Sequence, residues 1–142
     1  CTVVIGGWAR TVKELKEKYE DSLKALYFKD VFSLSDSVIN YENMYGCRIV
    51  HDLSPKIKEY IKSRVFTEEF NNIMNSETGI TIEEFFKNNL NLTDTAAKLY
   101  IHRNTLLYRL DKIQKSTGFD LRKFEDSWLF RLAWLIRKEK ER

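Results

Sequence analysis

The chain has 142 residues, 43% of them hydrophobic and 32% charged, and carries a formal net charge of +3. This length supports one domain or two small ones without disulfides or metal ions, and we expect two compact pieces. No run of about 18 apolar residues and no signal peptide is visible, and Cys1 and Cys47 make no CxxC pair, so the composition excludes a membrane-spanning helix and favours the cytoplasm.

The charge is unevenly divided along the chain. Residues 1–80 contain 11 Lys+Arg and 12 Asp+Glu, a net charge of −1, whereas residues 81–142 contain 13 and 9, a net charge of +4. A basic C-terminal part suggests a polyanionic partner, although an excess of this size is also common on surfaces that bind nothing.

The first 50 residues predict a strand, a helix and a second strand. "TVVI" has the pattern of a short strand ended by Gly6-Gly7, and "VINYE" is the second strand candidate. Between them, residues 12–29 predict a helix with these residues near one face: Val12, Leu15, Tyr19, Ser22, Leu23, Leu26 and Tyr27. Two strands are too few for a stable sheet, so upstream residues or a second chain should complete it.

The rest of the chain predicts helices. Pro55 suits the first turn of a helix that runs to about Phe70, and Gly79 closes that region. Thr81 and Glu84 have the spacing of a capping box, which predicts a helix that buries Ile82, Phe85, Phe86 and Leu90. Thr93 is the expected N-cap of the next helix, Gly118 ends the one that begins at His102, and a last helix covers about 124–139.

The stretch "IHRNTLLYRLDKI", residues 101–113, combines an anchored face with a polar start. Leu106, Leu110 and Ile113 fall on one helical stripe, and a short helix precedes the turn, as in a helix-turn-helix. Arg103 and Asn104 are therefore candidates for base edges in the major groove, where Arg matches guanine and Asn matches adenine. The candidates for phosphate contacts are Thr93, His102, Thr105, Tyr108, Arg109 and Lys112.

Each candidate also has an interpretation without DNA. Thr93 and His102 are suitable N-caps, Arg109 and Lys112 could pair with Asp111 or Asp94, and Tyr108 could be a surface aromatic. Any amphipathic basic helix would give the same periodicity.

The stretch from "TIEEFFKNNL" to "RLAWLI", residues 81 to about 136, resembles the C-terminal helix-turn-helix of the PucR and CdaR type of bacterial transcriptional regulators. "IHRNTLLYRLDKI" looks like that family's signature IHRNTLxYRLxKI at every fixed position. A looser similarity to Fis-type helix-turn-helix domains spans "TAAKLYIHRNTL", where Tyr100 replaces the usual glycine of the turn. The resemblance implies a mainly α fold: a Fis-like helix-turn-helix domain of four or five helices, preceded by a small partial α/β segment.

The first 50 residues, through "YEDSLKALYFKD", look like the end of the degenerate GGDEF-like domain that precedes the helix-turn-helix in such regulators. The implied organisation is this remnant at 1–53, a helical connector at 54–80 and the DNA-binding domain at 81–142. The resemblance also places a region that senses a small-molecule effector upstream of Cys1. No GGDEF motif or P-loop is present, so cyclase chemistry is not supported.

The last helix offers a candidate dimer face. Helix-turn-helix proteins usually bind DNA as dimers, so a homodimer is expected. Phe124, Trp128, Leu132 and Leu135 form one apolar stripe, which we expect to face the domain core. Phe130, Ala133 and Trp134 lie on the opposite side, where either a second copy or residues 1–80 of the same chain would cover them.

Neither catalysis nor a cofactor is predicted. The two histidines, His51 and His102, stand without a nucleophile motif or metal-ligand spacing, and Cys47 near His51 is better explained as an inert thiol. The sequence therefore predicts a protein that binds double-stranded DNA and is not an enzyme. The alternative is a module that has lost DNA binding and only dimerises. The association of its two copies through an apolar interface would depend little on salt.

Overall fold

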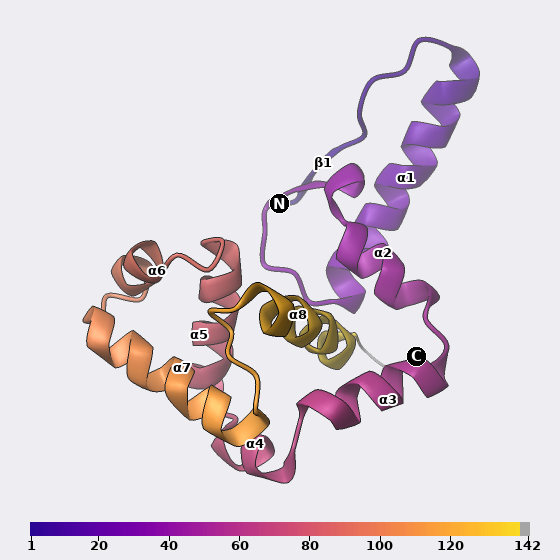
Figure 1. Ribbon diagram of the computed structural model, residues 1–142. Helices are drawn as coiled ribbons and strands as arrows, with labels where there is room; N and C mark the ends of the chain where they lie inside the picture. The colour runs from indigo at the N-terminus through magenta and orange to yellow at the C-terminus, as the bar shows by residue number, and fades with distance from the viewer. Residues whose placement is uncertain (140–142) are drawn as a thin grey trace. The chain divides into compact units, whose positions relative to one another are not determined.

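The computed structural model describes residues 1–139 and is mainly α-helical (Figure 1). Its elements follow in the order β1 (Val3–Ile5), α1 (Val12–Val31), β2 (Val38–Asn40), the 3-10 helix η1 (Tyr41–Asn43), α2 (Tyr45–Asp52), α3 (Pro55–Val65), α4 (Glu68–Ile73), α5 (Ser76–Lys87), α6 (Leu92–Lys98), α7 (Arg103–Thr117) and α8 (Phe124–Lys138). The predicted fold class, a helical domain after a small α/β segment, is confirmed.

The chain divides into two compact units. The first comprises residues 1–58 together with the end of the chain from Trp134, and the second comprises residues 59–133. The C-terminal part of α8 thus belongs to the first unit, and α4 to α7 belong to the second. No helix among residues 1–139 is long and apolar enough to cross a membrane.

In the first unit, β1 and β2 form a parallel pair with Val3 opposite Val38, and α1 makes the connection between them. The expected strand-helix-strand arrangement is therefore present, with the second strand shorter than "VINYE" because Tyr41–Asn43 turns into η1. The predicted apolar face of α1 is not its buried face. The helix buries Ala25, Phe28 and Val31, while most of the predicted face is exposed: Val12, Leu15, Tyr19, Leu23, Leu26 and Tyr27.

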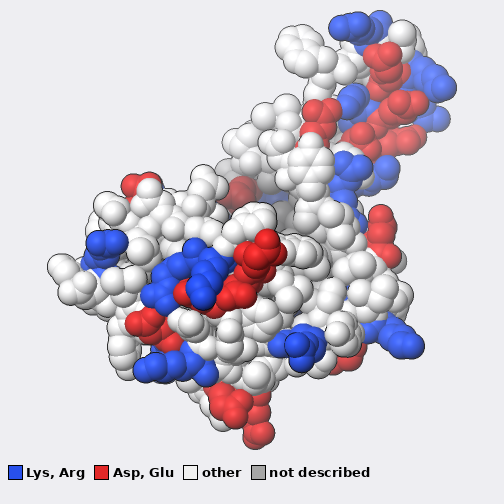
Figure 2. Space-filling model, in the orientation of Figure 1, with Lys and Arg blue, Asp and Glu red and all other residues white. Residues whose placement is uncertain are grey.

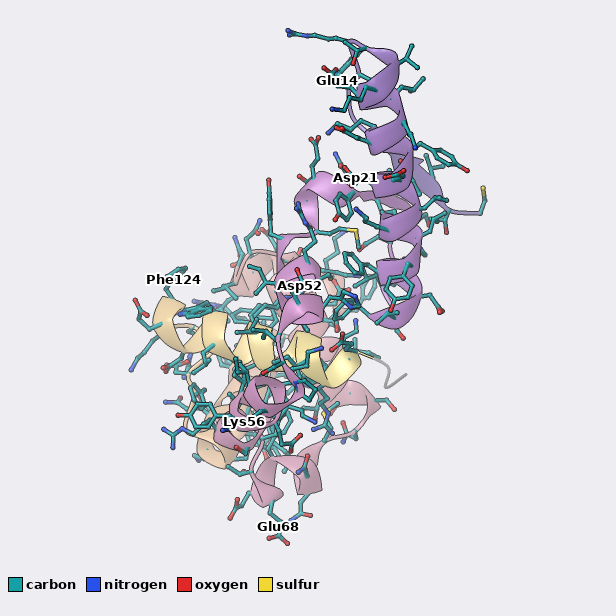
Figure 3. The ribbon with its side chains drawn as sticks, turned by 90° about the vertical axis from the view of Figure 1, so that its right-hand side faces the viewer. Glu14, Asp21, Asp52, Lys56, Glu68 and Phe124 are labelled. Atoms are coloured by element: carbon teal, nitrogen blue, oxygen red, sulfur yellow. The ribbon has the colours of Figure 1, made fainter. Side chains whose placement is uncertain are left out.

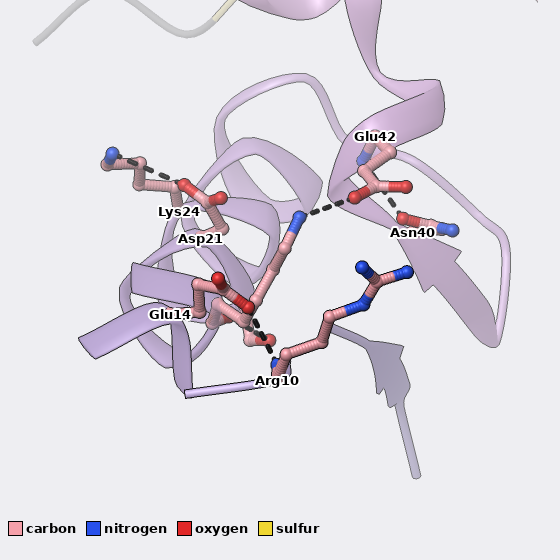
Figure 4. A network of polar contacts seen from close by, with 8 residues as sticks. Arg10, Glu14, Asp21, Lys24, Asn40 and Glu42 are labelled. Carbon is pink, nitrogen blue, oxygen red and sulfur yellow. Dashed lines mark hydrogen bonds and ion pairs between the residues drawn. The ribbon is translucent and has the colours of Figure 1, made fainter. Parts of the chain in front are cut away.

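Polar contacts fix α1 to the segment after β2 (Figure 4). Lys18 Nζ lies 2.5 Å from Glu42 Oε1, and Asn40 Oδ1 accepts from the Glu42 N–H, which caps η1. The hydrogen bond between the two side chains raises the pKa of Lys18 and lowers that of Glu42. Both groups are solvated, so the pair specifies geometry more than it stabilises the fold.

Position 46 in α2 has no room for a side chain, because a Cβ atom on Gly46 would lie 2.8 Å from Leu135 Cδ1. Glu139 follows α8 directly, and its carboxylate oxygens lie 2.5 Å from Lys58 Nζ and 3.5 Å from His51 Nδ1. His51 is thus engaged in a structural contact, while the Cys47 side chain is buried. No group of three or more metal-ligating side chains occurs within residues 1–139.

An aromatic cluster forms the centre of the second unit. The Phe130 ring stands edge-on to Phe66 and Phe70, with centroid distances of 5.8 and 5.9 Å, and stacks on Phe86 at 6.4 Å. Phe70, Phe85 and Phe130 are fully buried. The offset and edge-to-face geometries are those that aromatic quadrupoles favour.

The cluster corrects the prediction for α8. The candidate dimer face is buried within the chain, so a second copy cannot cover its residues Phe130, Ala133 and Trp134. The alternative, that residues 1–80 cover this face, holds for Phe130 through Phe66 and Phe70. Conversely, Phe124 and Trp128 of the expected core stripe are 74% and 51% exposed, and Figure 3 shows Phe124 at the outer end of the helix.

Three predicted helix boundaries are also wrong. The Pro55 helix ends at Val65, because Thr67 caps a new helix through a bond from the Phe70 N–H. Asn75 caps α5, so Gly79 lies inside that helix and Thr81 does not begin it. Thr81 is instead buried in α5, where its hydroxyl donates to the Glu77 carbonyl.

Candidate nucleic-acid interface

Helices α5, α6 and α7 pack on one another within the second unit (Figure 1). A four-residue connection, Leu99 to His102, joins α6 to the longer α7. This is the geometry of a helix-turn-helix, in which the second helix is the one that can enter the major groove.

The buried and exposed faces of α7 are cleanly separated. Leu106, Leu110 and Ile113 are no more than 1% exposed, as the periodicity predicted, and they anchor the helix in the core of the unit. The exposed residues include every predicted contact on this helix except Arg109: Arg103, Asn104, Thr105, Tyr108 and Lys112. The helix thus presents its polar first turn and one full side to solvent.

His102 is the N-cap of α7. Its Nδ1 accepts a hydrogen bond from the Asn104 N–H at 3.2 Å. A neutral imidazole that accepts through Nδ1 carries its proton on Nε2, so this exposed side chain keeps a donor for another partner. Capping and an outward contact are therefore compatible at this residue.

Thr93 is not the N-cap of α6. Asn91 has that role, because its Oδ1 accepts from the N–H groups of Thr93 and Asp94 at 2.9 and 3.1 Å. Asn is among the strongest N-cap residues and lies two positions earlier, so it takes the place that the sequence interpretation gave to Thr93. The Thr93 side chain is exposed in the first turn.

The turn between the helices contains Tyr100 in a left-handed backbone conformation, with φ +54°. The Ile101 N–H bonds to the Ala96 carbonyl and the Tyr100 N–H to the Ala97 carbonyl, which is the Schellman pattern that usually has glycine at this position. The left-handed conformation costs a residue with a Cβ atom roughly 1 to 2 kcal/mol. The turn therefore accommodates a side chain where Fis-type domains have glycine, and the backbone is strained.

Arg109 has a different position from the one predicted. Its guanidinium donates to the Thr81 hydroxyl at 3.1 Å and to the Glu77 carboxylate at 2.5 Å, so it links α7 to α5. The alternative partners, Asp111 and Asp94, do not pair with it; Asp111 pairs with Arg122 at 2.8 Å. Because both donor groups are engaged within the domain, Arg109 links α7 to α5.

Arg122 fixes the other end of α7 to the loop that follows. It donates to Asp120 Oδ1 at 2.6 Å and to Gln114 Oε1 at 2.8 Å, in addition to its pair with Asp111. Burial alone would raise the pKa of Asp120, but the hydrogen bonds from the Arg122 side chain and backbone outweigh it and lower that pKa. With Gly118 as the left-handed C-cap at φ +79°, as predicted, the end of α7 is well defined.

Basic and acidic side chains are interspersed on the visible surface (Figure 2). Attraction of a polyanion therefore depends on the charge of a local stretch and not of the whole surface. The stretch from Thr95 to Leu110 contains no acidic residue. Leu107, which the sequence interpretation left aside, is only partly buried one turn after Arg103. Leu107 follows Arg103 by four residues, and this spacing predicts that both lie on the same face of α7. An apolar side chain on that face can contact a thymine methyl.

A known domain family matches the part of the chain that contains these helices. Residues 80–136 match the model of the PucR C-terminal helix-turn-helix domain. The match includes α6, the strained turn and the whole of α7, together with most of α5 and α8.

Several bacterial proteins are similar to the chain. The chain is 40% identical over 60 residues to the carbohydrate diacid regulator of Escherichia coli, covering 42% of this chain and 16% of that protein. It is 36% identical over 53 residues to the purine catabolism regulatory protein of Bacillus subtilis, covering 37% and 10%. The uncharacterized protein YsfB of Bacillus subtilis is 32% identical over 127 residues, covering 88% and 32%. The chain thus spans less than a third of the length of these relatives.

A solved structure has a similar fold. The regulator of polyketide synthase expression from Bifidobacterium adolescentis aligns with a TM-score of 0.51 and 21% sequence identity, covering 82% of this chain and 49% of that one. The aligned share exceeds the helix-turn-helix domain, so the fold similarity extends into the part that surrounds it.

Proposed function

Because residues 80–136 match the PucR C-terminal helix-turn-helix domain, we propose that this chain binds specific double-stranded DNA as the DNA-reading part of a bacterial transcriptional regulator. The observation that carries the proposal is the first turn of α7. There Arg103 and Asn104 are exposed on a helix whose opposite face is anchored by fully buried leucines.

In this function α7 enters the major groove. Arg103 donates two hydrogen bonds to guanine, and Asn104 pairs with adenine through its amide, since these side chains match those base edges. The contacts to phosphate come from Lys112 and from the hydroxyl or imidazole groups of Thr93, His102, Thr105 and Tyr108. Arg109 contributes by holding α7 on α5.

Two copies would bind together. A dimer places two recognition helices about 34 Å apart, which corresponds to half-sites one turn of DNA apart. In this function the protein acts by binding DNA and catalyses no reaction, and it works in the bacterial cytoplasm. Two of its relatives are named as regulators.

The second candidate is a dimerisation module without DNA binding. The exposed pair Phe124 and Trp128, one turn apart on α8, favours it, because adjacent exposed aromatics are typical of protein contacts.

The deciding experiment is selection of bound duplexes from a random library, followed by titration of the selected DNA at two salt concentrations. We expect a two-part site with half-sites about 10 base pairs apart, bound less tightly at the higher salt. Binding by the Arg103→Ala/Asn104→Ala variant should lose this selectivity. Folded protein that enriches no sequence and binds no duplex would contradict the proposal.

Arg64→Ala is the matched control. Arg64 is an exposed arginine near the end of α3 in the same unit. The Thr67 hydroxyl, just beyond α3, donates to the Ser116 carbonyl, so this region adjoins the end of α7 that lies farthest from Arg103. Fifteen helical residues separate those ends by about 22 Å. The control should bind the selected site as the wild type does.

A further inference from the structure

Tyr100 lies in the strained turn and is almost fully exposed. Its side chain is 95% exposed, although its backbone has a positive φ of +54°. Among residues 1–139, three other non-glycine residues share a positive φ, and each has a local explanation: Ser33 and Asn89 are small polar residues, and Leu90 is partly buried. Tyr100 gains no such internal compensation.

The same chain shows what stability alone would favour at a helix end. The end of α7 has a glycine, Gly118, at φ +79°. Glycine adopts this conformation without strain, so it would also suit the Schellman turn after α6. The hydroxyl of Tyr100 has no hydrogen-bond partner in the described part of the chain. A large aromatic residue that is strained and exposed there indicates a role outside the domain's own packing.

The surroundings of Tyr100 along the chain fit a polyanion. Lys98 and Arg103 are exposed on either side of it, and no acidic residue lies between Thr95 and Leu110. The turn leads directly to His102, the N-cap of the helix that would enter the groove. A residue just before that helix lies where the phosphate walls of the groove pass, and tyrosine hydroxyls are common donors to phosphate oxygens.

We propose that Tyr100 is a DNA-contacting residue whose hydroxyl donates to a backbone phosphate beside the groove occupied by α7. This inference rests on the proposed function and extends it to Tyr100, which occupies a backbone conformation that favours glycine. The contact orients the domain on the duplex and does not read base sequence.

The test compares Tyr100→Gly and Tyr100→Phe with the wild type, using the selected duplex for affinity and urea unfolding for stability. The Gly variant should unfold at a higher urea concentration than the wild type, because the strain is relieved, and yet bind DNA more weakly. The Phe variant should keep wild-type stability and lose affinity by about three- to tenfold, the value of one hydrogen bond. A side chain with only a structural role would not separate affinity from stability in this way.

Salt dependence adds a second readout. Tyrosine is neutral, so its contact with a phosphate releases no counterion. Removal of the hydroxyl should therefore leave the slope of log Kd against log salt unchanged, unlike the removal of a lysine. Tyr60→Phe is the matched control, because Tyr60 is an exposed tyrosine on α3 of the same unit and its loss of a hydroxyl should not change affinity.

Two outcomes would overturn the inference in distinguishable ways. If the wild type binds DNA with steep salt dependence and both Tyr100 variants bind equally well, the Tyr100 contact is wrong and the proposed function stands. Tyr100 would then be a candidate for contact with a protein. If the folded wild type binds no duplex at all, the proposed function fails and the contact fails with it.

Discussion

Arg109 Nη2 lies 2.5 Å from Glu77 Oε1, and the same guanidinium donates to the buried Thr81 hydroxyl, so the side of α7 is tied to α5 at two points. Glu77 is largely solvated, which limits the value of the ion pair, whereas the bond to Thr81 is shielded by burial.

Arg109→Ala should destabilise the domain. The loss removes one partly shielded and one exposed hydrogen bond, and we expect a decrease of about 1 to 2 kcal/mol in the free energy of unfolding. Lys112→Ala, on the exposed face of the same helix, should change it by less than about 0.5 kcal/mol. Urea unfolding of both variants measures these changes in the free energy of unfolding. Equal decreases would show that the contacts of Arg109 with α5 do not stabilise the domain. Arg109→Lys should not restore stability, because an ammonium cannot span both acceptors.

Arg103 and Lys112 should affect DNA binding differently. Arg103→Ala should cost about 1 to 3 kcal/mol on the selected site and relax the preference at one base pair. Lys112→Ala should weaken binding to all sequences alike and reduce the salt slope by about 1. Titration of each variant on the selected site and on a scrambled duplex separates the two effects. Equal losses from both variants on both duplexes would contradict this division of roles.

His102 should contribute to stability and to binding through different atoms. His102→Ala removes the cap of α7 and should lower the free energy of unfolding by about 1 kcal/mol. Asn is an equally good cap, so His102→Asn should retain stability. Both variants lose the Nε2 donor and should bind DNA with similarly reduced affinity. Thermal unfolding followed by circular dichroism, with DNA titrations, tests the pair; a His102→Asn variant with full affinity would leave capping as the residue's only role.

Asp120→Asn should reveal a pH-dependent contribution to stability. The pKa of Asp120 is lowered from its ordinary value of 3.8, so the folded state favours the charged form more than the unfolded state does. Its contribution is therefore present above about pH 4 and is lost as the pH falls through the lower folded value. At pH 7 the variant should be about 1 to 3 kcal/mol less stable, because the bonds from Arg122 lose their charged acceptor.

That difference should shrink when the unfolding measurements are repeated near pH 3. Asp52→Asn removes an exposed carboxylate at the end of α2 and is the control, with no expected change at either pH. A deficit for Asp120→Asn that is the same at pH 7 and pH 3 would assign the loss to packing and not to charge.

The sequence predicted α7 well because its signals agree with one another. The stripe of Leu106, Leu110 and Ile113, the polar start and Gly118 all describe the same helix, and the structure has it at Arg103–Thr117. The boundaries failed where two residues compete for one role. Asn75 lies six positions before Thr81, Asn91 lies two positions before Thr93, and Asn is a stronger cap than Thr.

The choice of buried face could not be predicted for α1 and α8. Both helices are apolar on more than one side, so periodicity gives two candidate faces, and only the tertiary partners decide between them. For α8 the deciding contact is Phe130 with Phe66 and Phe70, more than 50 residues away in the sequence. The pair between Arg109 and Glu77 has the same origin, because nothing in either helix alone brings their charges together.

The order of pairing along the chain has a consequence for folding speed. In the second unit, α6 packs on α7 directly after it and on α5 directly before it, so little chain entropy is lost when these contacts form. In the first unit, the pairing of Val3 with Val38 must wait for α1 to close the connection, as in any parallel crossover. The helix-turn-helix should therefore form early, and the small sheet should reach its native register more slowly.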